Sequence, residues 1–503
     1  MGRLVDADKV FLAVDLGTSG VKVLAVNAAG QVLAEARRQY PTEFPRPGWV
    51  EQDPEEWWRA VCSALRQAVA GISGHTIAGI GLSGQMKGLV SVDRAGRPVR
   101  RCIVYTDARS TSEAEEIKSQ YGDELHRRTG GWVRTPATVT KLVWVLRHEP
   151  EVYNRTWRFL LPKDFVRLRL AGVIATDVTD AAGTLLYDVR EGTWAFDLIA
   201  RLGLNPEHFP QVLQPMIISG RVTLEASKAT GVPAGTPVVA GAADMACTVL
   251  GAGSIEVGDT SITISSAGQV LTVSQQLTGP VGTISSPHVL PGLSYLMGSV
   301  YAGGYSLNWT LDLLNGGKRQ GRAPLEAEAA EVPPGSEGLL FLPYLLGAAT
   351  PSFDVRARGA FLGVSAEHGR PHIVRAVMEG VAFHLRQCVE VIEESGRLVN
   401  TPVIGAGGSR SALWRQIVAD VLGRHLEIPA SPELAGLGAA ILAAAGTGSF
   451  PDIPAAVAAM VRHEGMVMPQ QSVRAPYEVQ YRRFRLATDW LLQSGFDRAW
   501  VRN

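Results

Sequence analysis

One short segment combines glycines, hydroxyl side chains and a carboxylate between two apolar runs. It is Asp15–Leu16–Gly17–Thr18–Ser19–Gly20, with the apolar runs at residues 9–15 and 21–26. Glycines let the backbone approach a ligand closely, and Thr18, Ser19 and backbone N–H groups can donate to phosphate oxygens. Asp15, at the end of the first run, could hold Mg²⁺ directly or through water. The segment predicts a phosphate-binding hairpin, although an ordinary turn has a similar composition.

A second glycine-rich segment lies near the other end of the chain. Gly405–Ala406–Gly407–Gly408–Ser409 follows a predicted strand at 402–404 and precedes a predicted helix at 411–423. A strand-to-helix junction of this kind suits a nucleotide that lies against the glycine backbone. Arg410 stands where a GxGxxG fingerprint needs its third glycine, so a Rossmann dinucleotide site is not indicated. The chain also lacks GxxxxGK[ST], which excludes a P-loop.

Asp244 is a lone carboxylate after the predicted strand at 237–242, inside a run rich in glycine and alanine. Burying an unpaired carboxylate costs free energy, so its presence needs a reason. One reason is a general base that accepts a proton from a substrate. The other is a cap at the start of a helix.

The elements that must position these residues fall into two similar halves. Apolar runs at 9–15, 21–26 and 31–37 predict three consecutive antiparallel strands, and a helix at 51–70 and a strand at 77–82 follow. After residue 255 the pattern starts again with a hairpin at 261–265 and 269–274, and helical spacing returns at 370–394. We therefore expect two α/β halves that divide near residue 255.

Composition excludes several classes of protein. Among 503 residues, 48 Lys and Arg balance 48 Asp and Glu, which gives no electrostatic footprint for nucleic acid. Four cysteines form no CxxC pair, so neither a disulfide framework nor a zinc site is expected. Residues 260–311 hold no Asp, Glu, Lys or Arg, but interleaved Ser, Thr, Gln and Gly argue against a membrane span. Residues 1–10 lack the apolar stretch of a signal peptide, so a soluble, cytoplasmic protein is expected.

Several motifs, in order along the chain, together resemble the FGGY carbohydrate kinase family. They are DLGTSGVK at 15–22, SGQM at 83–86, LPKDF at 161–165, GAADM at 241–245 and GAGGSRSALWRQIVAD at 405–420. Residues 359–379, which end at Glu379, resemble the C-terminal signature of that family. Within the family the pattern is most similar to that of the xylulokinases, or pentulose kinases. The segments that carry this likeness are SGQM, YTDAR at 105–109, KLVW at 141–144, LPKDF and TDAAGT at 179–184.

The resemblance implies an α/β, two-lobed, actin-like or ribonuclease-H-like fold with a nucleotide cleft between the lobes. Residues 1–256 would form the N-terminal lobe, with the sugar site, the first phosphate loop and the catalytic base, and residues 257–503 the nucleotide-binding C-terminal lobe. The implied reaction is ATP-dependent phosphorylation of a hydroxyl of D-xylulose or a related ketose or polyol, with Mg²⁺. Asp244 would be the catalytic base and Asp15 the metal residue. The nucleotide and phosphate contacts would come from Gly17, Thr18, Ser19, Ser265, Ser266, Gly268, Gly405, Gly407, Gly408 and Ser409.

The residues expected to bind the sugar depart from the family pattern. They are Gln85, Met86, Lys87, Asp107 and Met245. Lys87 stands where xylulokinases have a histidine, and it could bond a hydroxyl, pair with a substrate carboxylate or point to solvent. Met245 replaces an asparagine, and Asp107 could bind sugar hydroxyls or pair with Arg109. Another pentulose, a polyol or an aldonate therefore remains an alternative acceptor.

A protein of a different class is also compatible with these motifs. An actin-like ATP-binding protein, or a family member that has lost catalysis, would use the nucleotide as a conformational switch. The retained Asp244 and the intact C-terminal signature favour the kinase. We expect a small-molecule sugar or polyol as the partner, with neither nucleic acid nor membrane. A homodimer is common in the family but has no local signature in this sequence.

Overall fold

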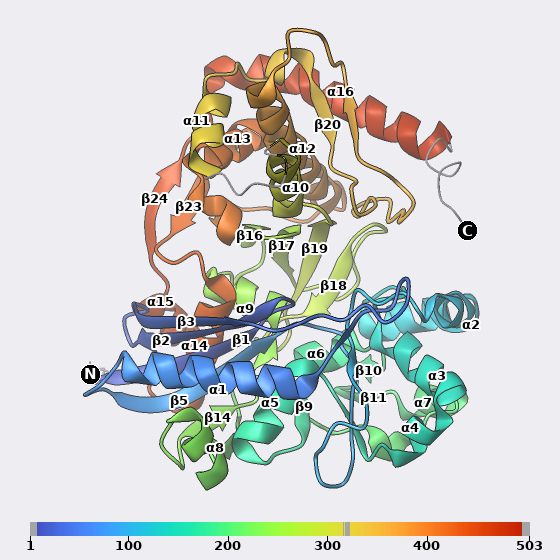
Figure 1. Cartoon of the computed structure of the whole chain (residues 1–503), viewed down its shortest axis with the longest axis vertical. Coiled ribbons are helices and arrows are strands. Elements are labelled where there is room, and N and C mark those ends of the chain that lie inside the picture. The colour runs from blue at the N-terminus through green and yellow to red at the C-terminus, as the bar shows by residue number, and fades with distance from the viewer. Residues whose placement is uncertain (1–7, 315, 317–321, 495–503) are drawn as a thin grey trace.

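The computed structural model describes residues 8–314, 316 and 322–494. Within them the strands form two large mixed sheets, which lie in two lobes stacked along the long axis of the molecule (Figure 1). We call these the first lobe, which contains β1, and the second lobe, which contains β16. The first sheet consists of β1 (Lys9–Leu16), β2 (Gly20–Asn27), β3 (Val32–Gln39), β5 (Thr76–Gly84), β13 (Ile218–Arg221), β14 (Pro237–Val239) and β15 (Ala242–Ala243).

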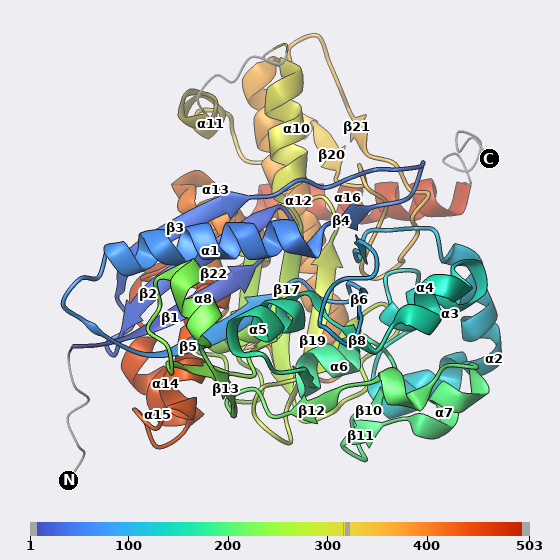
Figure 2. The ribbon, with the colours of Figure 1, turned by 60° about the horizontal axis from the view of Figure 1, so that its bottom comes forward.

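Helices and short strands complete the first lobe. Its helices are α1 (Pro54–Ala70), α2 (Thr111–Thr129), α3 (Thr138–His148), α4 (Pro150–Arg155), α5 (Pro162–Ala171), α6 (Val178–Gly183), α7 (Phe196–Arg201), α8 (Leu224–Thr230) and α9 (Asp244–Gly251). Its short strands are β4 (Glu51–Gln52), β6 (Val90–Val92), β7 (Cys102–Ile103), β8 (Arg158–Leu160), β9 (Ala175–Asp177), β10 (Tyr187–Asp188), β11 (Thr193–Trp194) and β12 (Gln211–Leu213). Elements between β5 and β13, with α2, α3, α4 and α7, form the outer part of this lobe (Figure 2).

The second lobe is built on a sheet of the same kind. Its strands are β16 (Thr260–Ile264), β17 (Gly268–Ser274), β18 (Ile284–Pro287), β19 (Ser294–Val300), β22 (Val403–Gly405), β23 (Leu426–Pro429) and β24 (His463–Val467), with β20 (Leu340–Leu342) and β21 (Ala360–Leu362) as a separate pair. The helices that follow residue 300 are α10 (Gly304–Leu314), α11 (Arg322–Ala330), α12 (Arg370–Glu394), α13 (Ala412–Leu422), α14 (Leu434–Gly446), α15 (Ile453–Met460) and α16 (Arg474–Ser494).

Both sheets share one strand order. The first runs β3-β2-β1-β5-β14, and the second runs β19-β17-β16-β22-β23. In each sheet three antiparallel strands precede parallel ones, and an antiparallel strand, β13 or β24, closes the far edge. The central strands β1 and β16 are buried along most of their length, because helices or the other lobe cover both faces of each sheet. The repeat predicted after residue 255 is therefore present in the topology.

Parallel pairing brings the ends of three strands of the first sheet into one row. Asp15 of β1 pairs with Ser83 of β5, and Ser83 pairs with Ala242 of β15. The carboxyl ends of parallel strands lie at the same edge of a sheet, where ligands bind in open α/β folds. Asp244, the first residue of α9, follows β15 directly, so the register places Asp15 and Asp244 at one edge.

The helices α14 and α15 lie in the second half of the chain but cover the first sheet. In Figures 1 and 2 they lie beside β1 and β5, and α14 contacts β1, β5 and α9. An added Cβ at Gly81 of β5 would stand 1.8 Å from the carbonyl oxygen of Ala439, and one at Gly438 would stand 1.9 Å from that of Cys247. α14 therefore packs backbone against backbone. The division at residue 256/257 stays a prediction, and α14, which follows it in the chain, contacts the sheet that precedes it.

α9 lies between the two sheets. One apolar cluster joins residues of β1 and β2, α9 and α14 to Leu271, Val273 and Tyr295 of the second sheet. The helix that begins with Asp244 therefore contacts residues of both lobes.

Two predicted elements differ in their bounds. The helix predicted at 51–70 begins at Pro54, because Asp53 caps it by accepting the Glu55 N–H at 2.9 Å, while Glu51–Gln52 pairs with β7. The strand predicted at 237–242 breaks at Gly241, whose φ of +77° is a left-handed conformation. Among the helices that the structure describes, none is long and apolar enough to cross a membrane.

Candidate active site

Asp244 lies at the N-terminus of α9, where helix N–H groups favour a negative charge. Its Oδ1 accepts the N–H of Met245 at 2.8 Å. Burial and the nearby charge of Asp15 raise the pKa of Asp244 to about 7, against the opposing effects of the Met245 N–H and Lys87. A carboxylate with a pKa near neutrality is suited to accept a proton from a hydroxyl. The helix-cap alternative is not what the structure shows, because Ala243 occupies the N-cap position.

Asp15 is the second carboxylate of this edge. The Ser83 hydroxyl donates to its Oδ1 at 2.8 Å, and Lys22 lies opposite it on β2. Burial raises the pKa of Asp15, although Lys22 and the Ser83 hydrogen bond lower it. Among the described residues, no group donates a hydrogen bond to its Oδ2. That oxygen is the kind of ligand that Mg²⁺ prefers.

Lys87 lies behind the row of strand ends in a strained backbone conformation, with a φ of +66°. A lysine rarely adopts this conformation, and such strain is concentrated at functional sites. Burial and Arg134 lower the pKa of Lys87 to about 8, while Asp244 raises it. Lys87 is half-buried and its charge interacts with the carboxylate of Asp244, which favours a side chain that points into the protein over one that points to solvent.

Arg134 reaches from the first lobe to the second. Its guanidinium lies 3.3 Å from the ring centroid of Phe353, and it hydrogen-bonds the Tyr301 hydroxyl. Burial lowers the pKa of Arg134 to about 10. Lys87 and Arg134 therefore place two cations in this region of the cleft.

Gln85 is fully buried and held in place. Its amide donates to Gln52 Oε1 at 2.9 Å and its backbone N–H donates to the Leu16 carbonyl at 2.8 Å. Its own Oε1 has no hydrogen-bond partner among the described residues. Met86 and Met245 pack against the apolar cluster between the sheets. Gln85 thus retains one acceptor for a ligand, and the two methionines supply an apolar boundary.

Asp107 is already engaged. Its carboxylate accepts hydrogen bonds from Nε and Nη2 of Arg109 at 2.8 and 2.7 Å and from the Val50 N–H at 2.5 Å. Arg109 in turn stacks on Trp49, 3.8 Å from the ring centroid. These contacts support the ion-pair alternative for Asp107. Its contact with sugar hydroxyls stays a prediction.

The two predicted phosphate loops are the turns of two equivalent hairpins. In the first, the Gly17 N–H donates to Gly20 O at 3.0 Å, and the side chains of Thr18 and Ser19 are exposed. In the second, the Ser265 N–H donates to Ala267 O at 2.8 Å, and Ser265 and Ser266 are exposed. Gly268 begins β17 and is buried. Both turns present hydroxyl groups that no sheet contact occupies.

The glycine-rich segment after β22 adjoins the second hairpin, since Gly405 pairs with Thr263 of β16. A Cβ at Gly405 would stand 2.4 Å from Leu434 Cδ1, and one at Gly408 would stand 2.5 Å from Ile264 Cγ2. These two glycines therefore allow close packing. Gly407 is exposed and has nothing within 4 Å of an added Cβ, so it leaves room for a ligand. The Ser409 hydroxyl donates to the Ala406 carbonyl at 2.7 Å.

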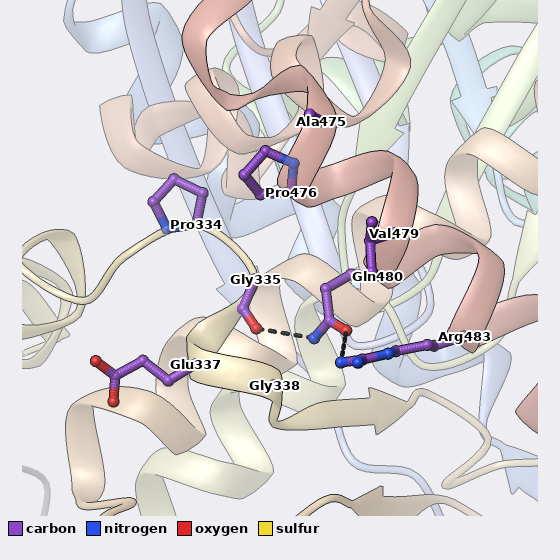
Figure 3. Close-up of a pocket in the computed structure, with 9 residues that line it drawn as sticks. All are labelled: Pro334, Gly335, Glu337, Gly338, Ala475, Pro476, Val479, Gln480 and Arg483. Atoms are coloured by element: carbon purple, nitrogen blue, oxygen red, sulfur yellow. Dashed lines mark hydrogen bonds between the residues drawn. The ribbon is translucent and has the colours of Figure 1, made fainter.

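A cavity of about 350 Å³ lies apart from these groups, between α16 and the loop before β20 (Figure 3). Gln480 crosses its wall and donates to the Gly335 carbonyl at 2.8 Å. The same loop is anchored by Glu379 of the C-terminal signature, which accepts the Gly335 N–H at 3.0 Å and the Ser336 hydroxyl at 2.8 Å. Glu379 thus has a structural role in the second lobe.

Sequence reasoning did not single out the residues that orient the site. Gln52 holds Gln85, Ser83 holds Asp15, and the Tyr105 hydroxyl bonds the Thr18 side chain. Ser83 and Tyr105 lie inside motifs recognised as a whole, SGQM and YTDAR, so their individual roles had no separate signal, and Gln52 lies outside the motifs on which the prediction was based. Phe353 covers Arg134 from the second lobe, and no motif in the sequence predicted this contact.

Comparisons with known proteins agree with this architecture. Residues 10–251 match the N-terminal domain of the FGGY family of carbohydrate kinases, and residues 253–447 match its C-terminal domain. A xylulose kinase from Bacillus subtilis is 34% identical over 468 residues, which are 92% of this chain and 93% of the relative. A xylulose kinase from Escherichia coli is 33% identical over 437 residues, or 86% and 89% of the two chains.

Solved structures show the same fold. The crystal structure of xylulose kinase from Rhodospirillum rubrum has a TM-score of 0.85 and 31% identity, and the match covers 97% of this chain and 99% of that one. A gluconate kinase from Lactobacillus acidophilus, at 24% identity and a TM-score of 0.86 over 97% and 99% of the chains, shares the fold. The fold is thus the two-lobed, actin-like one that the sequence predicted. The chain belongs to the FGGY family of carbohydrate kinases. It is accordingly an ATP-dependent kinase that acts on a small-molecule sugar.

Proposed function

We propose that this kinase phosphorylates a hydroxyl of D-xylulose or a related ketose or polyol, with Asp244 as the general base. The relatives named xylulose kinase support the acceptor. The observation that carries the mechanism is the pairing of two carboxylates at one sheet edge, one of which has its pKa raised to about 7. Asp244, ionised above that pH, accepts the proton of the acceptor hydroxyl as the oxygen attacks the γ-phosphorus of ATP.

Asp15 fits a metal role, because its Oδ2 is unused and its Oδ1 is oriented by Ser83. Mg²⁺ held by Asp15, directly or through water, supplies charge neutralisation for the phosphate oxygens. The two carboxylates would thereby have different roles, since Asp15 would hold the metal and Asp244 would accept the proton of the acceptor hydroxyl. The exposed hydroxyls of Thr18, Ser19, Ser265 and Ser266 would donate to phosphate oxygens, with the nucleotide against Gly407.

We expect Lys87 to make the substrate specificity differ from that of the xylulokinases. Its ammonium lies in a buried region with Arg134 and Asp244, where a histidine stands in the xylulokinase pattern. A cation at this position can bond a hydroxyl or pair with an anionic group of the acceptor. A matched panel of acceptors is therefore needed to rank substrates.

The test couples ADP release to a reporter across pentuloses, hexuloses, polyols and aldonates, at saturating Mg-ATP. The proposal expects the largest kcat/KM for D-xylulose or another neutral ketose or polyol. Aldonates as the preferred substrates would contradict the acceptor class and leave the kinase mechanism intact.

The base is tested by Asp244→Asn, which keeps the shape of the side chain and removes its basicity. We expect a loss of turnover of about 10²–10⁴-fold, the range of general-base catalysis, with ATP binding retained. Full activity of this variant would contradict the mechanism. A protein acting only as a nucleotide switch would bind ATP but release no ADP with any acceptor of the panel.

A further inference from the structure

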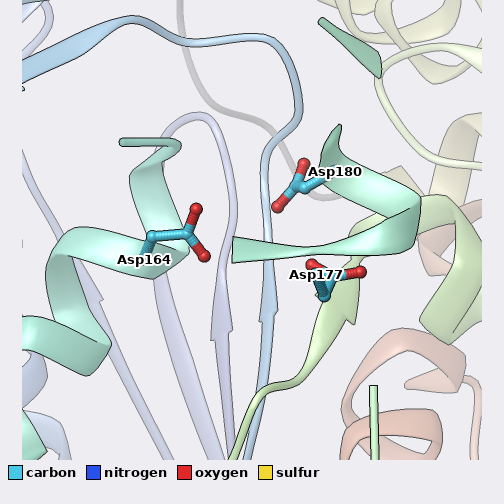
Figure 4. Close-up of side chains that lie close together, drawn as sticks. All are labelled: Asp164, Asp177 and Asp180. Atoms are coloured by element: carbon cyan, nitrogen blue, oxygen red, sulfur yellow. The ribbon is translucent and has the colours of Figure 1, made fainter. Parts of the chain in front are cut away.

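A buried cluster of charges lies directly behind the strand ends that carry the active-site residues. Asp164 of α5, Asp177 of β9 and Asp180 of α6 point their carboxylates toward one another (Figure 4). Three carboxylates in this arrangement resemble a metal site, but Lys163 occupies their centre. Its Nζ lies 2.8 Å from Asp164 Oδ1, 2.5 Å from Asp177 Oδ2 and 3.0 Å from Asp180 Oδ2. The cluster is therefore held by an ammonium group.

A second cation also contacts this cluster. Arg167 adds a second cation, whose Nη2 lies 3.0 Å from Asp164 Oδ1. Burial opposes the charge of Lys163, but the three carboxylates outweigh it and raise the pKa of Lys163. Burial, together with the charges of Asp177 and Asp164, raises the pKa of Asp180 well above its usual value. Two cations thus lie among three buried carboxyl groups, and the short contacts of Lys163 and Arg167 compensate for the burial of their charge.

The cluster is connected to Asp244 through one hydroxyl group. The Thr179 hydroxyl donates to Asp177 Oδ1, and the Ala243 N–H donates to the same hydroxyl oxygen at 2.9 Å. Ala243 is the N-cap residue of α9, immediately before Asp244, and its side chain can make no capping hydrogen bond. Arg167 Nη1 holds the same segment further back, at the Ala240 carbonyl, at 2.9 Å. Every side chain of this relay is buried.

We propose that Thr179 is a positioning residue for Asp244, and that the Lys163 cluster exists to orient its hydroxyl. Asp177, held by Lys163, accepts the hydrogen bond that the Thr179 hydroxyl donates. The lone pairs of that hydroxyl are therefore directed to the Ala243 N–H. That hydrogen bond fixes the peptide unit from which α9 and the Asp244 side chain start. The proposal rests on the base role of Asp244 proposed above. It gives a shared purpose to the LPKDF and TDAAGT motifs, which meet in this cluster.

The test replaces Thr179 with valine, which has the same shape and lacks the hydroxyl. We expect kcat to fall about 10–100-fold, the loss typical when a supporting hydrogen bond behind a catalytic group is removed, with KM for ATP nearly unchanged. Thr179→Ser retains the hydroxyl and should restore kcat to within about threefold of the wild-type value. A purely structural role would lower the amount of folded enzyme without this difference between Val and Ser in kcat per folded molecule.

Thr230→Val is the matched control. Thr230 lies at the end of α8, and its buried hydroxyl likewise donates to one group, the Ala226 carbonyl at 2.7 Å, and accepts from another, the Val232 N–H at 3.2 Å. We expect it to lower the unfolding temperature like Thr179→Val and to leave kcat unchanged.

The outcomes separate the two proposals. A kcat for Thr179→Val equal to that of Thr230→Val, with Asp244→Asn inactive, would overturn the positioning role and leave the base intact. An active Asp244→Asn would overturn the base and this inference with it. A Thr179→Ser variant as impaired as Thr179→Val would also overturn the relay, because its hydroxyl is present.

Discussion

The two lobes use the same hairpin for different purposes. The turns at 17–19 and 265–267 both follow the central strand of a sheet and both expose hydroxyl groups. The penultimate residue of the strand is Asp15 in the first lobe and Thr263 in the second. Asp15 faces Lys22 across its hairpin, whereas Thr263 faces Gln269, to which its hydroxyl donates at 2.6 Å.

The strands beside these hairpins differ in the same sense. Ser83 beside Asp15 leads into Gln85, Met86 and Lys87, whereas Gly405 beside Thr263 leads into Ala406, Gly407 and Gly408. The first lobe therefore has titratable groups at these strand ends, whereas the equivalent positions of the second lobe, Thr263 and 405–409, carry neutral side chains or glycine. Phosphoryl transfer needs charged groups near the reacting atoms, whereas carboxylates repel a polyanion such as ATP. A fold with two similar lobes can therefore place the charged groups in one lobe and bind the nucleotide with the other.

Substitutions at the equivalent residues Asp15 and Thr263 are expected to give the largest difference between the two lobes. Asp15→Asn should lower kcat about 10²–10³-fold, because a carboxylate at the metal position is lost. Thr263→Val should change kcat less than about threefold, because its hydroxyl bonds only Gln269. Steady-state kinetics at saturating Mg²⁺ and ATP measure both. Equal losses would show that the two hairpins carry equal roles.

The pH dependence of the reaction sharpens the role of charge in the first lobe. In the proposed mechanism Asp244 acts as its carboxylate, and its pKa is raised to about 7, so kcat/KM for the sugar should rise with pH and level off above that value. On the acid side it should fall about tenfold per pH unit, as expected for one essential base. Burial and the charge of Asp15 both raise this pKa, so Asp15→Asn should move the acid limb to lower pH. A limb that stays in place would show that Asp15 and Asp244 do not interact.

Lys87 tests whether the charged edge of the first lobe sets specificity. Lys87→His should shift the ranking of acceptors toward D-xylulose, by about tenfold in relative kcat/KM, because one polar contact to an acceptor group is worth that much. Asp107→Asn is a second variant to compare. Arg109 already bonds the Asp107 carboxylate, so this substitution should alter the stability of the protein more than the ranking of acceptors. An unchanged ranking in Lys87→His would place Lys87 outside the sugar site.

The smallest effect is expected in the second lobe. Ser266→Ala removes one exposed hydroxyl of the turn and should raise KM for ATP about two- to fivefold, the value of one neutral hydrogen bond, with kcat unchanged. Isothermal titration with ADP gives the same information without turnover. A large fall in kcat would show that the second turn takes part in the chemical step.

Local patterns predicted the two hairpins and the helices α1, α12 and α13 well, whereas α16 was not predicted. The helix α12 has the bounds 370–394 expected from its spacing, because apolar periodicity and Pro371 act within the segment itself. Local patterns could not show whether Asp107 binds sugar or pairs with Arg109. Val50 and Arg109 contact Asp107, and Trp49 contacts Arg109, only in the folded protein. Lys163, Asp177 and Asp180 are likewise separate polar residues in the sequence, and only the packing of α5 against α6 and β9 makes them one buried cluster.

The placement of α14 was also beyond local patterns. Its alanine and glycine content predicts a buried helix but not which sheet it covers. The answer depends on glycines in other segments, such as Gly81, whose missing side chain admits the helix backbone. Long-range complementarity of this kind leaves no periodic signal, so a split near residue 255 was the simplest interpretation of the repeat.

The same glycine contacts limit how this chain can change over generations. At Gly81 and Gly438 even a methyl group would overlap a carbonyl oxygen of the opposing backbone. Neither position can gain a side chain unless the helix moves away, and a helix that moves away leaves a void that no single further substitution fills. Mutational paths that enlarge these positions one step at a time therefore pass through unstable proteins. New acceptor specificities are easier to reach at Lys87 or Met245, which are predicted to bind the sugar, than by remodelling the contact of α14 with β5 and α9.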